Sequence, residues 1–523
     1  MHLMITKRTY KGKVAEHAKI VESYREKGKT PRKRTILNLG TIKSEADRKR
    51  FQQIAFEMKK GNEFVKLKEI ILKDAKEFGV TYTTNSLLEK YGVAKTLKEN
   101  LSKNKADFDI YEIIKALIIN RLVKPSSDLS AVDWIKKHYP EELKIKRHNI
   151  YRALDYLQEN KEEIEKEVFL KLKEKLNLDT ENIHYDLTSS YFEGNSCSIA
   201  MFGYSRDKRN DKKQVIIGLA MAEGIPIQHE VYEGNKVDKQ TLTTVTEKLK
   251  NLGIKNPTFI ADIGLLTANN IKELEDNKFR FLLGYPRRNN NIAKELLIKD
   301  IKTDKEQDAI EIKEENKRRY ILCIDENTKK ERLKTLEKIK ERLERELKEL
   351  QNKKTNKESL IIKTSKLLGK NKRLFDLNFV DNFKFSLNEE NYEYEKKIAG
   401  KFLLVTNTSL EPKEAMKSYK ELQTVENAFD EIKNFLEIRP IYHWKEQRVK
   451  AHVFICILAF LIECIIERFT KQTARKVINE LETIKLINLQ TNITQKRMIT
   501  ELSPKAEHLF SELSILKPIV TNI

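Results

Sequence analysis

Residues 183–286 constrain the fold most, because strand-like and helix-like segments alternate along them. Three apolar runs of strand length come first; a helical pattern, a strand, a second helical pattern and a last strand, "FRFLLGYP", follow. Adjacent strands combined with strand–helix–strand units are typical of an α/β domain with a mixed sheet. The pattern therefore excludes an all-helical and an all-β fold for this part of the chain.

The flanking sequence divides into segments where the periodicity of its apolar residues changes. Apolar and polar residues alternate on either side of the basic stretch "REKGKTPRK", which predicts a β-hairpin near the N-terminus. From about residue 45 to 178 the apolar period is close to 3.6, which predicts helices without strands. Leucines and isoleucines at three- and four-residue steps predict a long amphipathic helix within a later interruption of the α/β pattern. We expect six segments, the last of them helical or loosely ordered: 1–95, 96–178, 179–288, 289–396, 397–470 and 471–523.

The charge balance suggests the kind of partner. The 523 residues contain 101 Lys and Arg against 79 Asp and Glu, a formal net charge of +22, and the first fifty residues contain 15 basic and 5 acidic side chains. An excess of this kind favours binding of a polyanion such as nucleic acid. A genome biased toward Lys and Asn codons is an alternative explanation of the same charge.

Two predicted helices within the helical region resemble a helix-turn-helix reader of DNA. The segments "SSDLSAVDWIKKHY" and "KRHNIYRALDYL" are joined by a Pro-containing stretch, and the second begins with basic residues. A recognition helix presents such side chains to the major groove, so Arg147 and Arg152 are candidate DNA contacts. A helical pair with a solvated basic end explains the pattern equally well.

Two carboxylates stand at the edges of apolar strands. Asp186 lies in "IHYDLT" and Asp262 in "TFIADIG". Consecutive elements of an α/β sheet are usually neighbours, so we expect the two strands to bring these side chains together. Buried carboxylates that repel one another need a compensating charge, and Mg²⁺ or Mn²⁺ is suited because hard cations take oxygen ligands.

The chemistry that two such ions support is in-line phosphoryl displacement, which normally uses a third carboxylate. Glu426 in "YKELQTVENAFDEIK" is the candidate. The helical period places Tyr419, Glu426 and Lys433 along one face of a single predicted helix at seven-residue steps. A single Glu on a helix is usually only solvated, so periodicity alone does not make it a ligand.

Other features bear on the environment of the protein. The four cysteines show no CxxC pair or zinc spacing, which favours a reducing compartment without a structural metal. The N-terminus lacks the apolar core of a signal peptide, and the longest apolar run, from Val453 to Ile466, is too short to span a bilayer. We expect a cytoplasmic, nucleoid-associated protein that does not bind membranes.

Five motifs in a fixed order carry a resemblance to a known family. They are "YDLTSSYFEG", "GYSRDKRNDKKQVIIGLAM", "HEVYEGN", "ADIGLLTANNI" and the long segment that begins "YKELQTVENAFDEIKNFLEIRPIYHW". With these motifs the chain resembles the DDE transposases of bacterial insertion sequences, in the insertion-sequence-4 superfamily and most closely in its insertion-sequence-1634 branch. The resemblance extends from the N-terminal hairpin to about residue 466.

The resemblance implies a ribonuclease-H-like catalytic core, with a mixed five-stranded sheet and helices. The core would comprise 179–288 and 397–470, interrupted by a β-rich and long-helix insertion and preceded by a hairpin and helical DNA-binding region. Asp186, Asp262 and Glu426 would be the catalytic and metal-binding residues. The implied activity is cleavage and transfer of DNA strands, on terminal inverted repeats and target DNA, by a homodimer in the synaptic complex.

The resemblance also implies contacts to the DNA backbone. Tyr419 and Lys433 match the family signature around the glutamate and would touch phosphate near the transposon end, whereas Leu422 replaces the signature arginine. The loop "GYSRDKRNDKKQ" is a candidate phosphate-binding loop or a solvated basic turn. Its basic residues are Arg206, Lys208, Arg209, Lys212 and Lys213.

Further polar residues have both a structural and a functional interpretation. His229 and Glu230 follow a strand of the same sheet, and we expect a supporting rather than a catalytic role for them. Arg439, His443, Trp444 and Arg448 either meet DNA or pack a helix against the core; Trp444 is able to stack on an unpaired base.

Two other functions remain open on sequence alone. The first is a catalytically inactive relative that binds DNA, which the presence of all three carboxylates disfavours. The second is a standalone metal-dependent nuclease, for which the basic N-terminal region and the long insertion would be superfluous.

Overall fold

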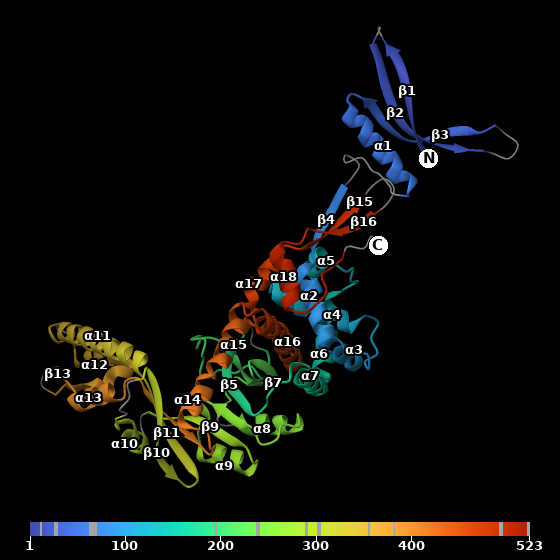
Figure 1. The fold of residues 1–523 in the computed structure, drawn as a ribbon. Coiled ribbons are helices and arrows are strands. Elements are labelled where there is room, and N and C mark those ends of the chain that lie inside the picture. The colour runs from blue at the N-terminus through green and yellow to red at the C-terminus, as the bar shows by residue number, and fades with distance from the viewer. Residues whose placement is uncertain are drawn as a thin grey trace. The chain divides into compact units, whose positions relative to one another are not determined.

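The computed structural model describes residues 1–10, 13–25, 30–61, 71–193, 196–236, 241–287, 291–300, 305–353, 356–380, 382–490 and 495–519. The chain forms two compact units. The first contains residues 1–76, 485–500 and 519–523, and the second contains 77–484 and 501–518. Figure 1 shows the elements of both.

The first unit contains the predicted N-terminal hairpin. Strand β2 (Lys13–Tyr24) pairs antiparallel with β3 (Arg32–Ile42), as expected, and β1 (His2–Tyr10) adds a third strand that the sequence pattern missed. Residues 26–29 of the predicted basic turn lie outside the described residues. Helix α1 (Glu45–Lys59) follows, and Ser44 and Asp47 form a capping box at its start.

A second small sheet in this unit corrects two predictions. Strand β4 (Ile71–Glu77) lies in a stretch predicted to contain helices only, and β15 (Lys485–Gln490) and β16 (Gln495–Ile499) lie in the predicted C-terminal helical region. The three strands form one sheet in the order β16-β15-β4. Local periodicity did not predict β4, because its partner strand β15 lies about four hundred residues further along the chain.

The second unit contains a helical region built around one buried helix. Helix α16 (Glu446–Thr470) packs against α4, α6 and strand β7. Its 25 residues are long and apolar enough to cross a membrane, but 89% of its most apolar window is buried inside the protein. The apolar run from Val453 to Ile466, which the sequence analysis judged too short to span a bilayer, is thus part of a longer core helix. The other helices of this region are α2 (Gly79–Lys90), α3 (Val93–Leu101), α4 (Ile110–Val123), α5 (Asp128–His138), α6 (Arg147–Glu159), α7 (Lys161–Leu176), α17 (Ala474–Leu481) and α18 (Pro504–Glu512).

The α/β part is organised by one mixed sheet of eight strands, where five were expected. The order is β10-β11-β14-β9-β8-β5-β6-β7. Strands β5, β8 and β9 are parallel, and the other pairs are antiparallel. The strands are β5 (Asn182–Tyr191), β6 (Gln214–Ala222), β7 (Ile225–Glu233), β8 (Thr258–Ala261), β9 (Arg280–Tyr285), β10 (Gln307–Glu315), β11 (Arg318–Asp325) and β14 (Lys401–Thr406). The sheet exceeds the prediction because β10 and β11, from the expected insertion, extend its edge beyond β14.

Alternation along the strands separates the two faces of this sheet. Phe259 and Ala261 belong to the larger apolar cluster, and Ile260 between them belongs to a smaller cluster on the other face. Helices α14 (Pro412–Lys420) and α15 (Gln423–Asn434) follow β14, and α14 contacts β8, β9 and β10 while α15 contacts β5 and β6. The other helices beside the sheet are α8 (Leu242–Asn251), α9 (Ala268–Asp276) and α10 (Asn291–Leu297).

The predicted long amphipathic helix is present as α11 (Glu326–Gln351). Its buried Leu343 and Leu347 join a separate apolar cluster with residues of α12 (Lys357–Leu368) and the β12–β13 hairpin. The helix therefore buries its apolar side within its own region of the chain. The hairpin strands are β12 (Phe375–Asn378) and β13 (Lys384–Leu387), and α13 (Glu389–Lys397) leads back to the sheet.

Candidate active site

Asp186 lies in the middle of the large sheet. Strand β5 has β8 on one side and β6 on the other. Tyr185 and Leu187 point into the larger apolar cluster, so alternation puts Asp186 on the opposite face. That face of β5 is contacted by α15. The apolar neighbours that surround Asp186 in the sequence thus form the core beneath the site.

Asp262 directly follows β8. Because β5 and β8 are parallel, with Tyr185 opposite Ala261, Asp186 and Asp262 occupy corresponding positions at one edge of the sheet. The expectation that the two strands are neighbours is confirmed. The backbone of Asp262 remains extended, with φ −77° and ψ 169°, and then turns into a short 3₁₀ helix, Ile263–Leu265.

Glu426 lies in the first turn of α15, where the helix dipole favours a carboxylate. The predicted continuous helix is wrong at this point. α14 ends at Lys420 and α15 begins at Gln423, so Tyr419 and Glu426 belong to different helices. The break reorients the tyrosine, whose hydroxyl donates a hydrogen bond to Oδ1 of Asp262 at 3.0 Å.

The three carboxylates line one cavity of about 380 Å³, together with side chains of β5, the β8 end and α15. The pKa of Asp186 is raised to about 7, mainly by burial and also by the charges of Asp262 and Glu426, whereas a backbone hydrogen bond from Leu187 and the charge of Arg206 act in the opposite direction. The group of oxygens is therefore electrostatically unfavourable by itself. It is the donor set that a hard divalent cation takes.

Basic side chains lie on the same cavity. Arg206 and Lys433 line it, and Lys433 is bound to Asp207 at 2.8 Å. Arg439 forms an ion pair with the same Asp207 oxygen. Asp207 was missed by the sequence analysis; the available signal was an acidic residue inside a strongly basic loop. Burial lowers the pKa of Lys433, and Asp207 opposes that effect.

The remaining predicted DNA contacts lie in two places. In the loop before β6, Arg209 makes a bidentate pair with Asp211, with both distances 2.8 Å, and Lys212 binds Glu193 at 2.8 Å. Lys208 is exposed and Lys213 is half-buried. In α6, Arg147 is exposed and Arg152 binds Asp107 at 2.6 Å. The structure thus brings only Arg206 and Lys433, among the predicted basic residues, to the carboxylate cavity.

His229 and Glu230 lie in another buried network. The Nδ1 atom of His229 is 2.7 Å from Glu165, and the ammonium group of Lys161 binds both Glu165 and Glu230 at 3.0 Å. This network joins β7 to α7. The supporting role expected for His229 and Glu230 stays a prediction; their contacts with Glu165 and Lys161 give it a structural basis.

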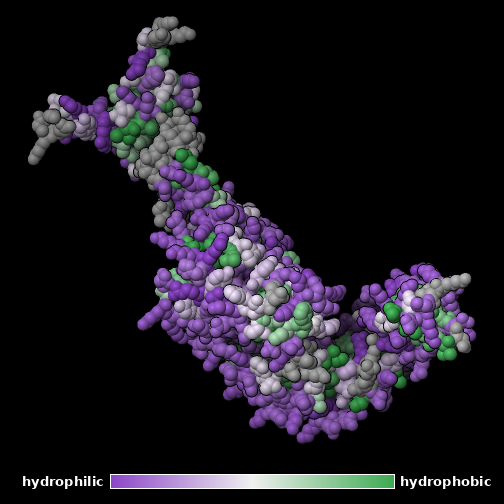
Figure 2. Space-filling model, turned by 180° about the vertical axis from the view of Figure 1, so that it is seen from behind, coloured by the Kyte–Doolittle hydropathy of each residue, from purple (hydrophilic) through white to green (hydrophobic). Residues whose placement is uncertain are grey.

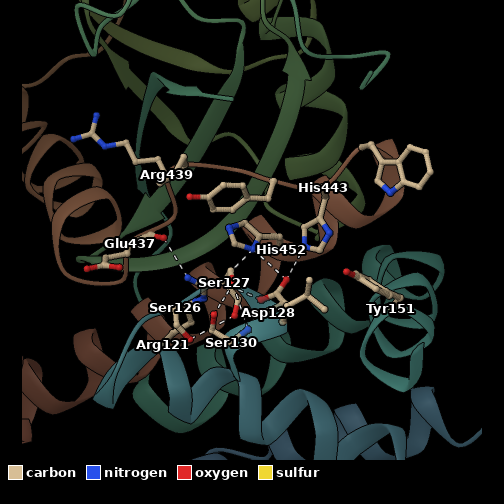
Figure 3. Close-up of a pocket in the computed structure, with 14 residues that line it drawn as sticks. Arg121, Ser126, Ser127, Asp128, Ser130, Tyr151, Glu437, Arg439, His443 and His452 are labelled. Carbon is tan, nitrogen blue, oxygen red and sulfur yellow. Dashed lines mark hydrogen bonds and ion pairs between the residues drawn. The ribbon is translucent and has the colours of Figure 1, made fainter. Parts of the chain in front are cut away.

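A second polar cluster occupies a cavity of about 500 Å³ between the helical region and residues 437–444 (Figure 3). His443 Nε2 lies 2.6 Å from Asp128 Oδ2, and Arg121 lies 3.1 Å from the other oxygen of Asp128. His452 contacts the Ile438 carbonyl through Nε2 at 3.0 Å and Arg121 through Nδ1 at 3.3 Å. In Figure 3 Asp128 and both rings face one another, whereas Arg439 points away.

This Asp–His–His group has ligand atoms close enough to hold a metal. Arg121 already supplies the positive charge, however, and both nitrogens of His452 face hydrogen-bonding partners. A metal would have to displace a buried guanidinium, so we interpret the cluster as an ion-pair network that fastens residues 437–444 to α4 and α5. Trp444 beside it is 67% exposed.

Comparison with known proteins identifies the family. Residues 186–462, more than half of the chain, match the family model of the transposase DDE domain. The chain is a DDE transposase. Residues 3–69 match the model of the N-terminal domain of IS1634 family transposases, so this transposase belongs to the IS1634 family. It is an enzyme that acts on DNA, and transposases of the DDE type depend on divalent metal ions.

The transposase was also compared with curated proteins and with solved structures. No curated protein matches this transposase. Among solved structures, it is similar to a piggyBac transposase, determined by cryo-electron microscopy in a synaptic complex with hairpin DNA, with 10% sequence identity and a TM-score of 0.37. The similarity covers 79% of this chain and 82% of the piggyBac chain.

Proposed function

We propose that this transposase cuts and joins DNA strands at the cavity lined by Asp186, Asp262 and Glu426. The observation that carries the proposal is that three carboxylates from β5, the end of β8 and α15 line one cavity, although up to 240 residues separate them in the sequence. Sheet order supports a ribonuclease-H-like core, because β7-β6-β5-β8-β9 is antiparallel as far as β5 and parallel from β5 to β9.

The same three residues would hold Mg²⁺ or Mn²⁺. Their oxygen-only donor set and the raised pKa of Asp186 fit a cation that replaces the bound proton. When two such ions are bound, they supply activation of the attacking oxygen and stabilisation of the leaving oxygen. The protein contributes the orientation of the carboxylates, through the β5–β8 register and the Tyr419 hydrogen bond to Asp262.

Basic residues around the cavity would hold the DNA backbone. Arg206 lines the cavity next to Asp186, and the loop that follows it carries Lys208, Arg209, Lys212 and Lys213. Tyr419 and Lys433 are proposed contacts as well, although Lys433 must first exchange Asp207 for phosphate. The surface seen in Figure 2 is mainly hydrophilic, with apolar residues in small separate patches.

Recognition of the terminal inverted repeats would belong to the segments before the core. The N-terminal hairpin region carries the highest local positive charge, and α5 and α6, with Arg147 and Arg152, form the proposed helix-turn-helix. We retain the six-segment division, a homodimer in the synaptic complex and action on the nucleoid in the cytoplasm as parts of this proposal.

The test is a cleavage and strand-transfer assay with Mg²⁺ or Mn²⁺ on DNA taken from the flanks of the gene. The intact protein should cut and transfer, and Asp186→Asn should abolish both while it still binds the DNA. Asp430→Asn is the matched control, because Asp430 lines the same cavity but is not one of the three ligands. Equal loss in both variants, or retained cleavage in Asp186→Asn, would refute the proposed site.

A further inference from the structure

A second cavity borders the carboxylate cavity. Its volume is about 650 Å³, and it shares Asp262, Gln423 and Glu426 with the first. Its other walls come from the end of β9, from β14 and from α14. The lining residues that matter here are Gly284, Arg287, Tyr419, Lys420 and, after the end of α14, Leu422.

The sheet order separates the two cavities. β8, which ends at Asp262, lies between β5 and β9. The first cavity is lined from the β5 side, through Asp186, and the second from the β9 side, through Gly284 to Arg287. Asp262 and Glu426 therefore line both cavities, one on the β5 side of β8 and the other on its β9 side.

Arg287 gives the second cavity a positive side. It is half-buried, and its charge acts on the Tyr419 hydroxyl, which in turn binds Asp262. The hydroxyl of Tyr394, on α13, donates a hydrogen bond to the Arg287 carbonyl at 2.9 Å, which fixes the backbone at this position. Lys420 also lines the cavity and binds Asp325 at 2.8 Å.

The glutamate helix offers no cation on this side. Leu422, which stands where the family signature has arginine, lines the same cavity as a buried apolar side chain. A guanidinium from the end of β9 is therefore the group that is suited to a planar, bidentate contact with phosphate.

We propose that the second cavity binds a backbone phosphate of the DNA strand that is being cut, and that Arg287 makes this contact. The inference rests on the proposed function, because it takes Asp262 and Glu426 as part of the cleavage site. A strand that crosses these carboxylates continues on both sides of them. Arg206 and its loop serve the side of β5, and Arg287 serves the side of β9.

Single methylphosphonate substitutions test this contact, since each removes the charge of one backbone phosphate. Duplexes from the flanks of the gene carry one substitution each, placed in turn around the cut, and binding is measured by fluorescence anisotropy in Ca²⁺. The proteins are the intact chain, Arg287→Ala, Arg287→Lys and Arg332→Ala. Arg332 is exposed on α11, so its variant loses the same charge outside the cavity.

At one position, the substitution should weaken DNA binding about tenfold for the intact chain and for Arg332→Ala, because the charge of that phosphate is lost. The same substitution should not weaken binding further for Arg287→Ala. Arg287→Lys, which keeps the charge, should recover part of that contribution. A contribution that is equal in the intact chain and in Arg287→Ala at every substituted position would overturn the inference. Thermal melting of each variant identifies any that fails to fold. If Arg287→Ala does not fold, Arg287→Lys decides alone, and a phosphate contribution equal to that of the intact chain at every position overturns the inference.

A cleavage assay with Mg²⁺ on the same duplexes separates this inference from the proposed function. If the intact chain never cuts DNA with Mg²⁺, the proposed function fails. If one phosphate nevertheless loses its contribution only in Arg287→Ala, the phosphate contact of Arg287 stands, and only its assignment to a strand that is being cut falls with the proposed function.

Discussion

The hydroxyl of Tyr419 donates a hydrogen bond to Asp262 at 3.0 Å, although the two residues are 157 positions apart in the sequence. Gly284 on β9 makes this approach possible. A Cβ at position 284 would lie 2.3 Å from the Tyr419 hydroxyl and 3.3 Å from Asp262 Oδ1. The tyrosine thus orients a proposed metal ligand, in addition to any contact that it makes with DNA.

Replacing Tyr419 with Phe should weaken metal binding. Partners that orient a ligating carboxylate typically contribute about tenfold or more to metal affinity, so the Mn²⁺ dissociation constant should rise by about tenfold in isothermal titration calorimetry. Tyr204→Phe is the control, since Tyr204 is 83% exposed. Unchanged Mn²⁺ affinity in Tyr419→Phe would show that the hydrogen bond does not position Asp262.

Gly284→Ala should imitate the loss of that hydrogen bond, because the added methyl group displaces the hydroxyl. The double variant Gly284→Ala/Tyr419→Phe should bind Mn²⁺ about as well as either single variant, since both changes remove the same contact. Mn²⁺ titrations of all three variants measure this coupling. Independent, additive losses would contradict it.

Asp128 should contribute strongly to stability. It is buried between Arg121, His443 and His452, and removal of one partner from a buried pair typically costs about 3–5 kcal/mol. Asp128→Ala should lower the free energy of unfolding by about that amount in urea titrations. Asp107→Ala, which breaks the exposed pair with Arg152, should lower the free energy of unfolding far less, because solvent screens that pair. Similar losses in the two variants would refute the buried network.

Glu463 should make stability depend on pH. Its pKa is raised to about 8, mainly by burial in α16 and also by the charges of Glu431 and Glu467, while the charge of Arg475 acts in the opposite direction. The folded protein therefore holds a proton that the unfolded chain releases near pH 4.5, and this contribution to stability is lost as the pH rises toward 8.

Glu463→Gln remains neutral over that range. Relative to the parent it should gain stability between pH 5 and pH 9, by about 2 kcal/mol or more at pH 9. Urea titrations at several pH values measure the difference. Exposed Glu341 provides the control variant Glu341→Gln. A stability difference that is flat between pH 5 and pH 9 would contradict the burial of an ionisable Glu463.

The sequence predicted the centre of the fold well, because the signal there is local. Apolar alternation around Asp186 and Asp262 identified two core strands, and the rule that consecutive elements lie side by side made them neighbours. The long amphipathic helix α11 was predicted from leucine spacing alone. The strand ends indicated Asp186 and Asp262, whereas Glu426 depended mainly on the order of the family motifs; the catalytic role of the three carboxylates stays a prediction.

Non-local pairing explains what the sequence did not predict. β4 pairs with a strand at the other end of the chain, and the sheet gains β10 and β11 from a segment expected to lie apart from it. The break between α14 and α15 carries no Pro or Gly, so the helical period continued through it undisturbed. Asp207 stands in a basic loop, and its contacts with Lys433 and Arg439 become apparent only when the chain is folded.

The most direct test of the account is DNA cleavage and strand transfer with Mg²⁺ or Mn²⁺ by the intact chain, by Glu426→Ala and by Asp430→Ala. Glu426 and Asp430 lie one turn apart on α15 and line the same cavity. The account predicts that activity disappears in Glu426→Ala and persists in Asp430→Ala, while both variants still bind the DNA ends. An intact chain that binds these ends tightly and never cuts them, or a Glu426→Ala variant that still cuts, would contradict it.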